Sequence, residues 1–187
     1  MKYFERNHDY LLELAEDETI QVPITQYAGN DFISLGMGTI TIRKHYAWDG
    51  SSIPFKRLAQ RLTFGKYDPD KYCKEASLVH DAFYQLMRSK LLSRSHKDSI
   101  DRLYERMCIE GATKIIFDES HAARIKILKS NLTNKQKTRK LTSLTKKQNR
   151  LLNGLPGWAA RRYWAVKHFG ARTLKPRYYP EKKILET

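Results

Sequence analysis

The sequence predicts an α+β fold, in which a small antiparallel β-sheet packs on an antiparallel helix hairpin and a C-terminal helix. Three observations favour this class. Alternating apolar and β-branched residues are confined to the first 50 residues, two segments with helical apolar spacing follow, and a third such segment lies near residue 160. Because the strands precede the helices instead of alternating with them, the sheet is expected to be antiparallel.

The strands are expected at the N-terminal end of the chain. Residues 19–25 alternate apolar and polar side chains and predict a strand, which Pro23 restricts to a sheet edge. Residues 31–46 predict a hairpin, because a Gly-Met-Gly turn separates an apolar run from a β-branched one. Residues 48–54 then leave the sheet as a turn-rich loop, and residues 56–63 predict a short helix.

Two longer helices are expected to form the hairpin. The first begins at about Pro69 or Lys71 and ends at Arg88, with an apolar stripe at Ala76, Val79, Phe83, Leu86 and Met87. The second covers residues 95–110, and Gly111 suits its C-terminal end. The short link between these two helices predicts that they run antiparallel.

The rest of the chain is less apolar. Residues 119–129 predict further helix, and residues 130–150, rich in Lys, Thr, Asn and Gln, predict either a solvated helix or a linker. Pro156 and Gly157 predict a restart of the chain before a last helix over residues 158–169.

Charge divides the chain into three predicted parts. Residues 1–118 contain 17 Lys and Arg and 17 Asp and Glu, and they predict a neutral α+β body. Residues 119–187 contain 18 Lys and Arg and three Asp and Glu, and supply the whole net charge of +15. We expect a basic helical insertion or linker at 119–156, and a closing helix with a basic tail at 157–187 that packs on the body.

Composition also indicates a compartment. Two cysteines are too few for a disulfide framework and fit a reducing cytosol. The N-terminus has no apolar signal core, and no apolar run approaches the ~20 residues that span a bilayer. We therefore expect a soluble protein of the cytoplasm in which it is made, and packaging inside a virus particle would leave no signal either.

The candidate site lies within residues 76–84. His80 and Asp81 stand in the middle of an apolar helical pattern, and Tyr84 follows one turn after His80. Asp is a poor residue for a helix interior, and burying its charge is costly unless it is paired or coordinated. The pattern therefore predicts a functional site.

Helical geometry predicts a partner for His80. Asp101 lies beside the apolar stripe of the second helix, and the levels of the two residues, counted from the hairpin centre near Leu92, differ by less than one turn. A carboxylate bonded to one ring nitrogen orients the other nitrogen toward water, which makes His80 a candidate general base. The alternative is a structural pair at the edge of the core, with Tyr84 serving only to pack.

Two further carboxylates suggest a cation. Asp81 would be free to bind a hard cation, Ca²⁺ or Mg²⁺, through oxygen, and Asp49 in the loop after the hairpin would add a second carboxylate. Such a metal polarises a carbonyl or phosphoryl group. The alternative for Asp49 is the capping of a turn before Gly50.

Four motifs together resemble a family of small, mostly bacteriophage proteins known as domain of unknown function 1353. The motifs are Trp48-Asp49-Gly50-Ser51-Ser52-Ile53-Pro54, Val79-His80-Asp81-Ala82-Phe83-Tyr84, Ile100-Asp101-Arg102-Leu103-Tyr104 and Tyr163-Trp164-Ala165-Val166-Lys167-His168-Phe169-Gly170. The family pattern has Ala at 51 and 100 and Arg at 167, and the stretch 119–155 looks like an insertion. The resemblance implies a phage origin and no settled activity.

The helix with His80 is also similar to that of phospholipase A2 enzymes. This similarity implies that His80 activates water, that Asp81 binds calcium, and that Asp101 orients His80 with support from Tyr84. The chain lacks the disulfides of the secreted enzymes and their glycine-rich calcium loop, for which residues 48–50 are a loose substitute.

Residues 119–187, the basic third of the chain, predict a polyanionic partner, either nucleic acid or an anionic membrane surface. Its candidate binding residues are Lys135, Lys137, Arg139, Lys140, Lys146, Lys147, Arg150, Arg161 and Arg162. No feature predicts base readout, so contacts would go to the phosphate backbone. A face that serves only solubility is the alternative.

Two functions follow from the sequence. The first is a metal-dependent phage hydrolase with a site at His80, Asp81 and Asp101. The second is a non-enzymatic phage protein that binds nucleic acid, or joins other phage proteins in the virion, through its basic third.

Overall fold

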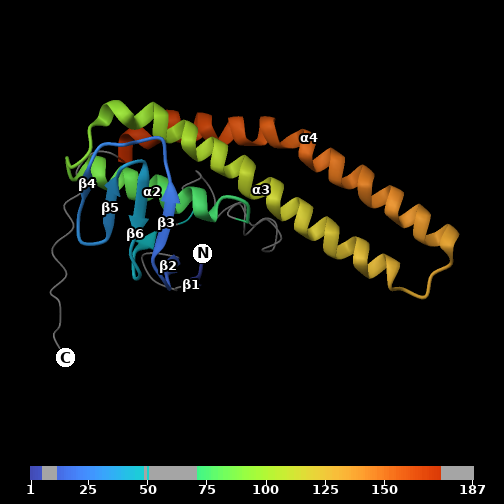
Figure 1. Ribbon diagram of the computed structural model, residues 1–187. Helices are drawn as coiled ribbons and strands as arrows, with labels where there is room; N and C mark the ends of the chain where they lie inside the picture. Colours follow the sequence, from blue (N-terminus) through green and yellow to red (C-terminus); the bar gives the residue numbers. More distant parts are fainter. Residues whose placement is uncertain (6–11, 49, 51–70, 174–187) are drawn as a thin grey trace.

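The computed structural model describes residues 1–5, 12–48, 50 and 71–173, and it confirms the α+β class (Figure 1). One antiparallel sheet has the order β1-β2-β7, formed by Tyr3–Glu5, Leu12–Leu14 and Ala47–Trp48. The other has the order β3-β6-β5-β4, formed by Glu18–Gln21, Thr39–Ile42, Ile33–Gly36 and Ala28–Gly29. The helix expected over 56–63 lies outside the described residues.

The predicted hairpin is β5 and β6. Met37 and Gly38 both have positive φ, 50° and 74°, as the two central residues of a type I′ turn require. The register pairs the inward-facing residues across the two strands, and four of these side chains are buried in the core, namely Ile33, Leu35, Ile40 and Ile42. The strand predicted over 19–25 is β3, which is shorter than predicted and ends at Gln21, before Pro23. It forms an edge of its sheet, as expected.

The helix hairpin consists of α2 (Lys74–Arg88), a short 3₁₀ turn η1 (Arg94–His96) and α3 (Lys97–Leu128). The prediction that Gly111 ends the second helix was wrong. A Cβ at Gly111 would lie 2.8 Å from the carbonyl oxygen of Tyr72, so glycine is required here by a close approach of backbone and not by a helix end.

Helix α4 runs without interruption over Asn134–Thr173. The predicted restart at Pro156 was wrong. Proline inside a helix costs about 3 kcal/mol, but Leu155 and Ala159 beside it are buried, and Leu155 packs with Ala112 and Ile116 of α3. This burial along α3 holds the helix together while Pro156 itself faces solvent.

The distal halves of α3 and α4 form an arm, which we define as residues 112–128 and 134–155 with the link between them. Figure 1 shows the arm extending away from the sheets as an antiparallel pair, while the C-terminal end of α4 returns beside α2. Within the arm, the Arg124 guanidinium donates to Thr145 Oγ1 and Gln148 Oε1 at 3.1 and 3.2 Å. No helix in the described part of the chain is long and apolar enough to span a bilayer.

Candidate functional site

The site lies where α2 and α3 pack against each other. His80 Nε2 is 3.0 Å from Asp101 Oδ1, so the contact predicted from helix geometry is present. Seven residues before His80 and seven after Asp101, Cys73, the residue before α2, and Cys108 share a second buried cluster. The two pairs show that α2 and α3 keep one antiparallel register along their contact.

Asp101 is the centre of the site. Its side chain is fully buried, at 0% exposure, and it accepts three hydrogen bonds. His80 Nε2–H and the Tyr84 hydroxyl, at 2.7 Å, donate to Oδ1, and Lys97 Nζ donates to Oδ2 at 2.6 Å. A buried carboxylate needs such compensation to stay ionised.

These contacts fix the tautomer of the neutral His80 ring. The Asp101 carboxylate accepts only, so Nε2 carries the proton, and Nδ1 of the neutral ring holds the free lone pair. Nδ1 lies 3.8 Å from Asp81 Oδ1, beyond hydrogen-bond range. The ring itself is held between Tyr84 and Tyr104, with centroid separations of 4.1 and 5.1 Å.

The electrostatics of the pair favour an ion pair. Burial lowers the pKa of His80, but the hydrogen bond to Asp101 and the nearby Asp81 carboxylate outweigh it and raise the pKa above 6.5. Burial alone would raise the pKa of Asp101, and the hydrogen bonds from His80, Lys97 and Tyr84 reverse this and lower it. Burial and the Asp101 charge raise the pKa of the Tyr84 hydroxyl, which therefore stays a donor.

Sequence reasoning missed Lys97. It lies one turn before Asp101 on α3, and the i,i+4 spacing of a Lys and an Asp was the available signal. Its Nζ also donates to the carbonyl oxygen of Lys167 at 3.1 Å, so it joins the site to the C-terminal end of α4. There Gly170 packs directly on Tyr84, where a Cβ would lie 2.5 Å from the hydroxyl oxygen.

The predicted cation site is only partly covered by the structure. Asp81 is partly exposed at the rim of the site, whereas Asp49 lies outside the described residues. Trp48 lies near the site, because its Nε1 donates to Ser77 Oγ at 3.2 Å, and Ser77 lies one turn before His80 on α2. Among the described residues, no group of three His, Cys, Asp or Glu side chains could hold a metal ion.

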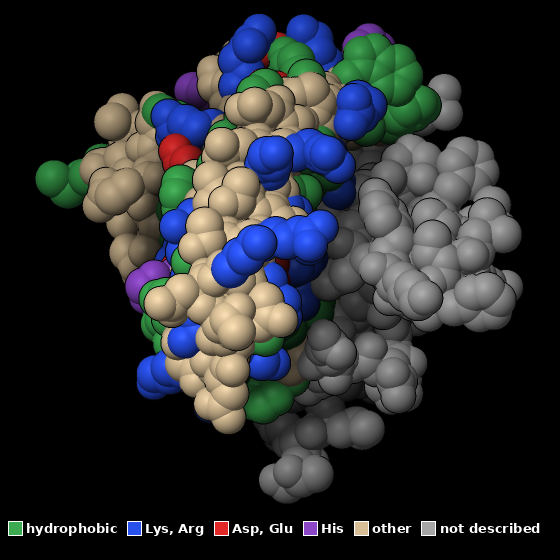
Figure 2. Space-filling model, turned by 90° about the vertical axis from the view of Figure 1, so that its right-hand side faces the viewer, with side chains coloured by type: hydrophobic (Ala, Val, Ile, Leu, Met, Phe, Trp, Pro, Cys, Tyr) green, Lys and Arg blue, Asp and Glu red, His purple; other side chains and the backbone are tan. Residues whose placement is uncertain are grey.

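The basic residues lie on the arm and on the outside of α4. Figure 2, which views the arm from its tip, shows Lys and Arg side chains spread over this end with few acidic ones. Seven of the nine predicted binding residues are exposed, namely Lys135, Arg139, Lys140, Lys146, Lys147, Arg150 and Arg161.

The other two predicted binding residues make contacts within the fold. Arg162 is buried with its guanidinium 4.3 Å from the Trp158 ring centroid, so its assignment to the exposed binding surface was wrong. Lys137 donates to the carbonyl oxygen of Leu128 at 2.8 Å and closes the end of α3.

Comparisons with known proteins add no relative. No protein-family model, no curated protein and no solved structure matches this chain. The site therefore has to be interpreted from its own geometry.

Proposed function

We propose that the protein is a hydrolase of ester bonds in which His80 is the general base. The observation that carries the proposal is the double hydrogen bond to Asp101 Oδ1, from His80 Nε2 at 3.0 Å and from the Tyr84 hydroxyl at 2.7 Å. Asp101 thereby orients the imidazole and leaves Nδ1 as the nitrogen that takes a proton. Its negative charge then stabilises the imidazolium.

In the proposed reaction, His80 Nδ1 accepts a proton from water while the water oxygen attacks the ester carbonyl carbon. The tetrahedral intermediate collapses, the bond to the leaving oxygen breaks, and Nδ1 returns the proton to that oxygen. Asp101 stays ionised throughout, because Lys97 and Tyr84 continue to donate to it. A divalent cation on Asp81, Ca²⁺ or Mg²⁺, would polarise the carbonyl oxygen when bound.

The similarity to phospholipase A2 enzymes suggests phospholipids as the first substrates to test. The assay measures fatty-acid release from mixed micelles, with and without calcium or magnesium. His80→Asn and Asp101→Asn should each abolish the release. His45→Asn is the matched control, because His45 Nδ1 lies 2.8 Å from Glu13 Oε1 and forms a second His–carboxylate pair in the β-sheet region. Equal activity of wild type and His80→Asn would refute the proposal.

A second function, polyanion binding by the basic part of the chain, has its own support. Helix α4 contains 11 Lys and Arg and no Asp or Glu, and the arm has a net charge of +9 from 11 basic and two acidic residues. Such a surface attracts a polyanion through counterion release. We expect the protein to be retained on a heparin column and its retention to fall steeply with salt. Elution already at low salt would indicate that the basic surface serves solubility alone.

A further inference from the structure

The outer face of α4, as we define it, consists of seven exposed residues that share one side of the helix. At 100° per residue they fall within an arc of roughly 80°, and they are Lys135, Arg139, Lys146, Arg150, Arg161, Trp164 and His168. We propose that this face binds single-stranded nucleic acid, with the cations along the phosphate backbone and Trp164 as a stacking platform for a base. The inference rests on the polyanion binding proposed above and names its ligand class.

The cations of this face are available for an external partner. Lys135, Arg139, Lys146 and Arg150 span about 22 Å of the arm at 1.5 Å per residue. Among the described residues, no carboxylate forms an ion pair with any of these four. By contrast, the guanidinium of Arg124 is used inside the arm, where it donates to Thr145 and Gln148.

The aromatic end of the face is ordered and open. Trp164 is 55% exposed, although a tryptophan gains free energy from burial. His168 stacks on it with 4.7 Å between centroids, and the His168 Nδ1–H donates to the Trp164 carbonyl oxygen at 2.8 Å. Phe169 meets the indole edge-on at 5.7 Å. These contacts fix the indole ring in advance, which reduces the entropy lost when a base stacks on it.

A single strand fits this arrangement better than a duplex or a membrane does. The bases of a duplex are stacked on one another, so Trp164 has a free base to stack on only in a single strand. A helix that lies on a membrane needs apolar side chains along the surface that it presents. The apolar side of α4 is buried in the fold instead, since Leu155 packs with Ala112 and Ile116 of α3 and Ala159 is fully buried.

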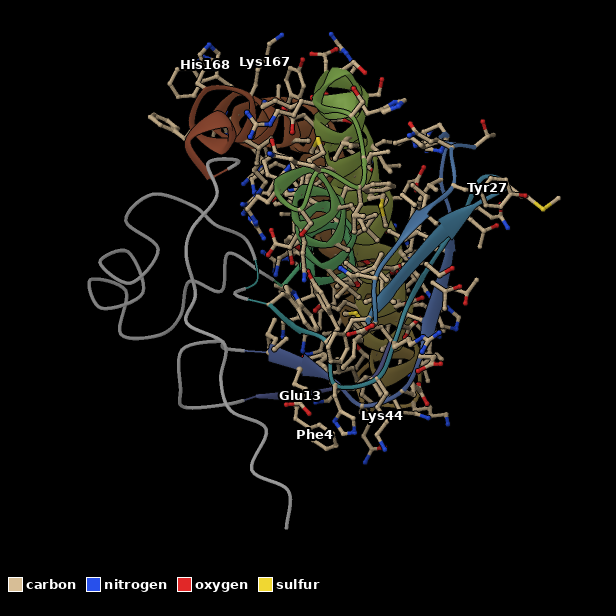
Figure 3. All side chains as sticks on the ribbon, turned by 90° about the vertical axis from the view of Figure 1, so that its left-hand side faces the viewer. Phe4, Glu13, Tyr27, Lys44, Lys167 and His168 are labelled. Carbon is tan, nitrogen blue, oxygen red and sulfur yellow. The ribbon has the colours of Figure 1, made fainter. Side chains whose placement is uncertain are left out.

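The test compares three probes by fluorescence anisotropy and competition, using the full chain. The probes are a labelled oligo-dT of about 20 nucleotides, a duplex of the same length, and heparin. Trp164→Ala should weaken oligo-dT binding about tenfold, which corresponds to the loss of one base–aromatic stacking contact. It should leave heparin binding unchanged. Tyr27→Ala is the matched control, because Tyr27 is 72% exposed and lies directly before β4, far from Lys167 and His168 (Figure 3).

Charge variants separate the two levels of the inference. Replacing Lys135, Arg139, Lys146 and Arg150 by Gln should weaken both oligo-dT and heparin binding and reduce the salt slope for the oligonucleotide by roughly three. If Trp164→Ala binds oligo-dT like the wild type, the stacking inference is overturned while polyanion binding stands. If the wild type binds neither oligo-dT nor heparin at low salt, the proposal of polyanion binding fails as well. Binding to vesicles of phosphatidylserine but not to oligo-dT would assign the face to a membrane and refute the inference.

Discussion

Lys97 Nζ lies 2.6 Å from Asp101 Oδ2, the carboxylate oxygen that His80 and Tyr84 leave free. A permanent cation therefore shares the carboxylate with the imidazole. This arrangement keeps the buried Asp101 ionised, and it also limits how strongly Asp101 attracts a proton to His80. Because Lys97 Nζ also donates to the carbonyl oxygen of Lys167, the position of its charge depends on how α4 packs beside the site.

We expect Lys97→Met to raise the pKa of His80. Without the ammonium, more of the Asp101 charge acts on the imidazolium, while the Asp81, Tyr84 and Tyr104 contacts to the ring are unchanged. The measurement is an NMR titration of the imidazole resonances. Lys97→Arg, which keeps the charge, should leave the titration close to that of the wild type. A His80 pKa that is the same in all three proteins would contradict this account.

The stability of the fold should depend on pH through the same pair. The folded-state pKa of His80 is raised above 6.5. Its contribution to the free energy of unfolding is therefore complete below pH 6.5 and is lost as the pH rises through the folded-state pKa. The folded-state pKa of Asp101 is lowered below 3.8, so its contribution is present above 3.8 and is lost as pH falls through the folded value.

Urea unfolding at a series of pH values measures both effects. Asp101→Ala should cost about 3 kcal/mol at neutral pH, because it leaves Lys97 and His80 without their buried partner. In this variant the free energy of unfolding should also lose most of the decrease that Asp101 causes as the pH falls below 3.8. An unfolding free energy within 0.5 kcal/mol or so of the wild type would show that the buried network contributes little.

Two glycines of α4 offer a matched pair of substitutions. A Cβ at Gly170 would lie 2.5 Å from the Tyr84 hydroxyl oxygen, which is held by Asp101, so Gly170→Ala should destabilise the protein by about 1–3 kcal/mol. A Cβ at Gly154 meets nothing within 4 Å, so Gly154→Ala should stabilise the helix by roughly 0.5–1 kcal/mol. Thermal unfolding followed by circular dichroism compares the two. Equal shifts in the same direction would mean that α4 does not pack closely on the site.

The two cysteines should be unreactive in the native protein. Cys73 and Cys108 are both fully buried, and burial raises the pKa of the Cys108 thiol, so little thiolate forms. A chromogenic disulfide reagent should titrate both thiols in 6 M guanidinium or so and react slowly without denaturant. Rapid native reaction would indicate that this part of the contact between α2 and α3 opens readily.

Local patterns were sufficient for much of the fold. The turn at Met37 and Gly38 needs positive φ, and the alternating residues around it have one apolar side, so the hairpin could be predicted from a few adjacent residues. The same holds for α2, whose buried positions follow the helical period. Strands β1, β2, β4 and β7 were missed because segments of two or three residues are too short to show an alternation.

What the sequence by itself determined is the pair of His80 and Asp101, since helix rise and a short link fix which residues of two antiparallel helices lie at one level. What only the tertiary structure decided are the contacts made across long distances in the chain. Gly111 and Pro156 predicted breaks, yet both helices continue. Gly111 is needed because the carbonyl oxygen of Tyr72 leaves no room for a Cβ, and the burial of Leu155 outweighs the local cost of Pro156. The contact of Lys97 with Asp101 is local, because the two residues are four apart on α3. Its second hydrogen bond, to the carbonyl oxygen of Lys167 70 residues away, is one that only the tertiary structure supplies.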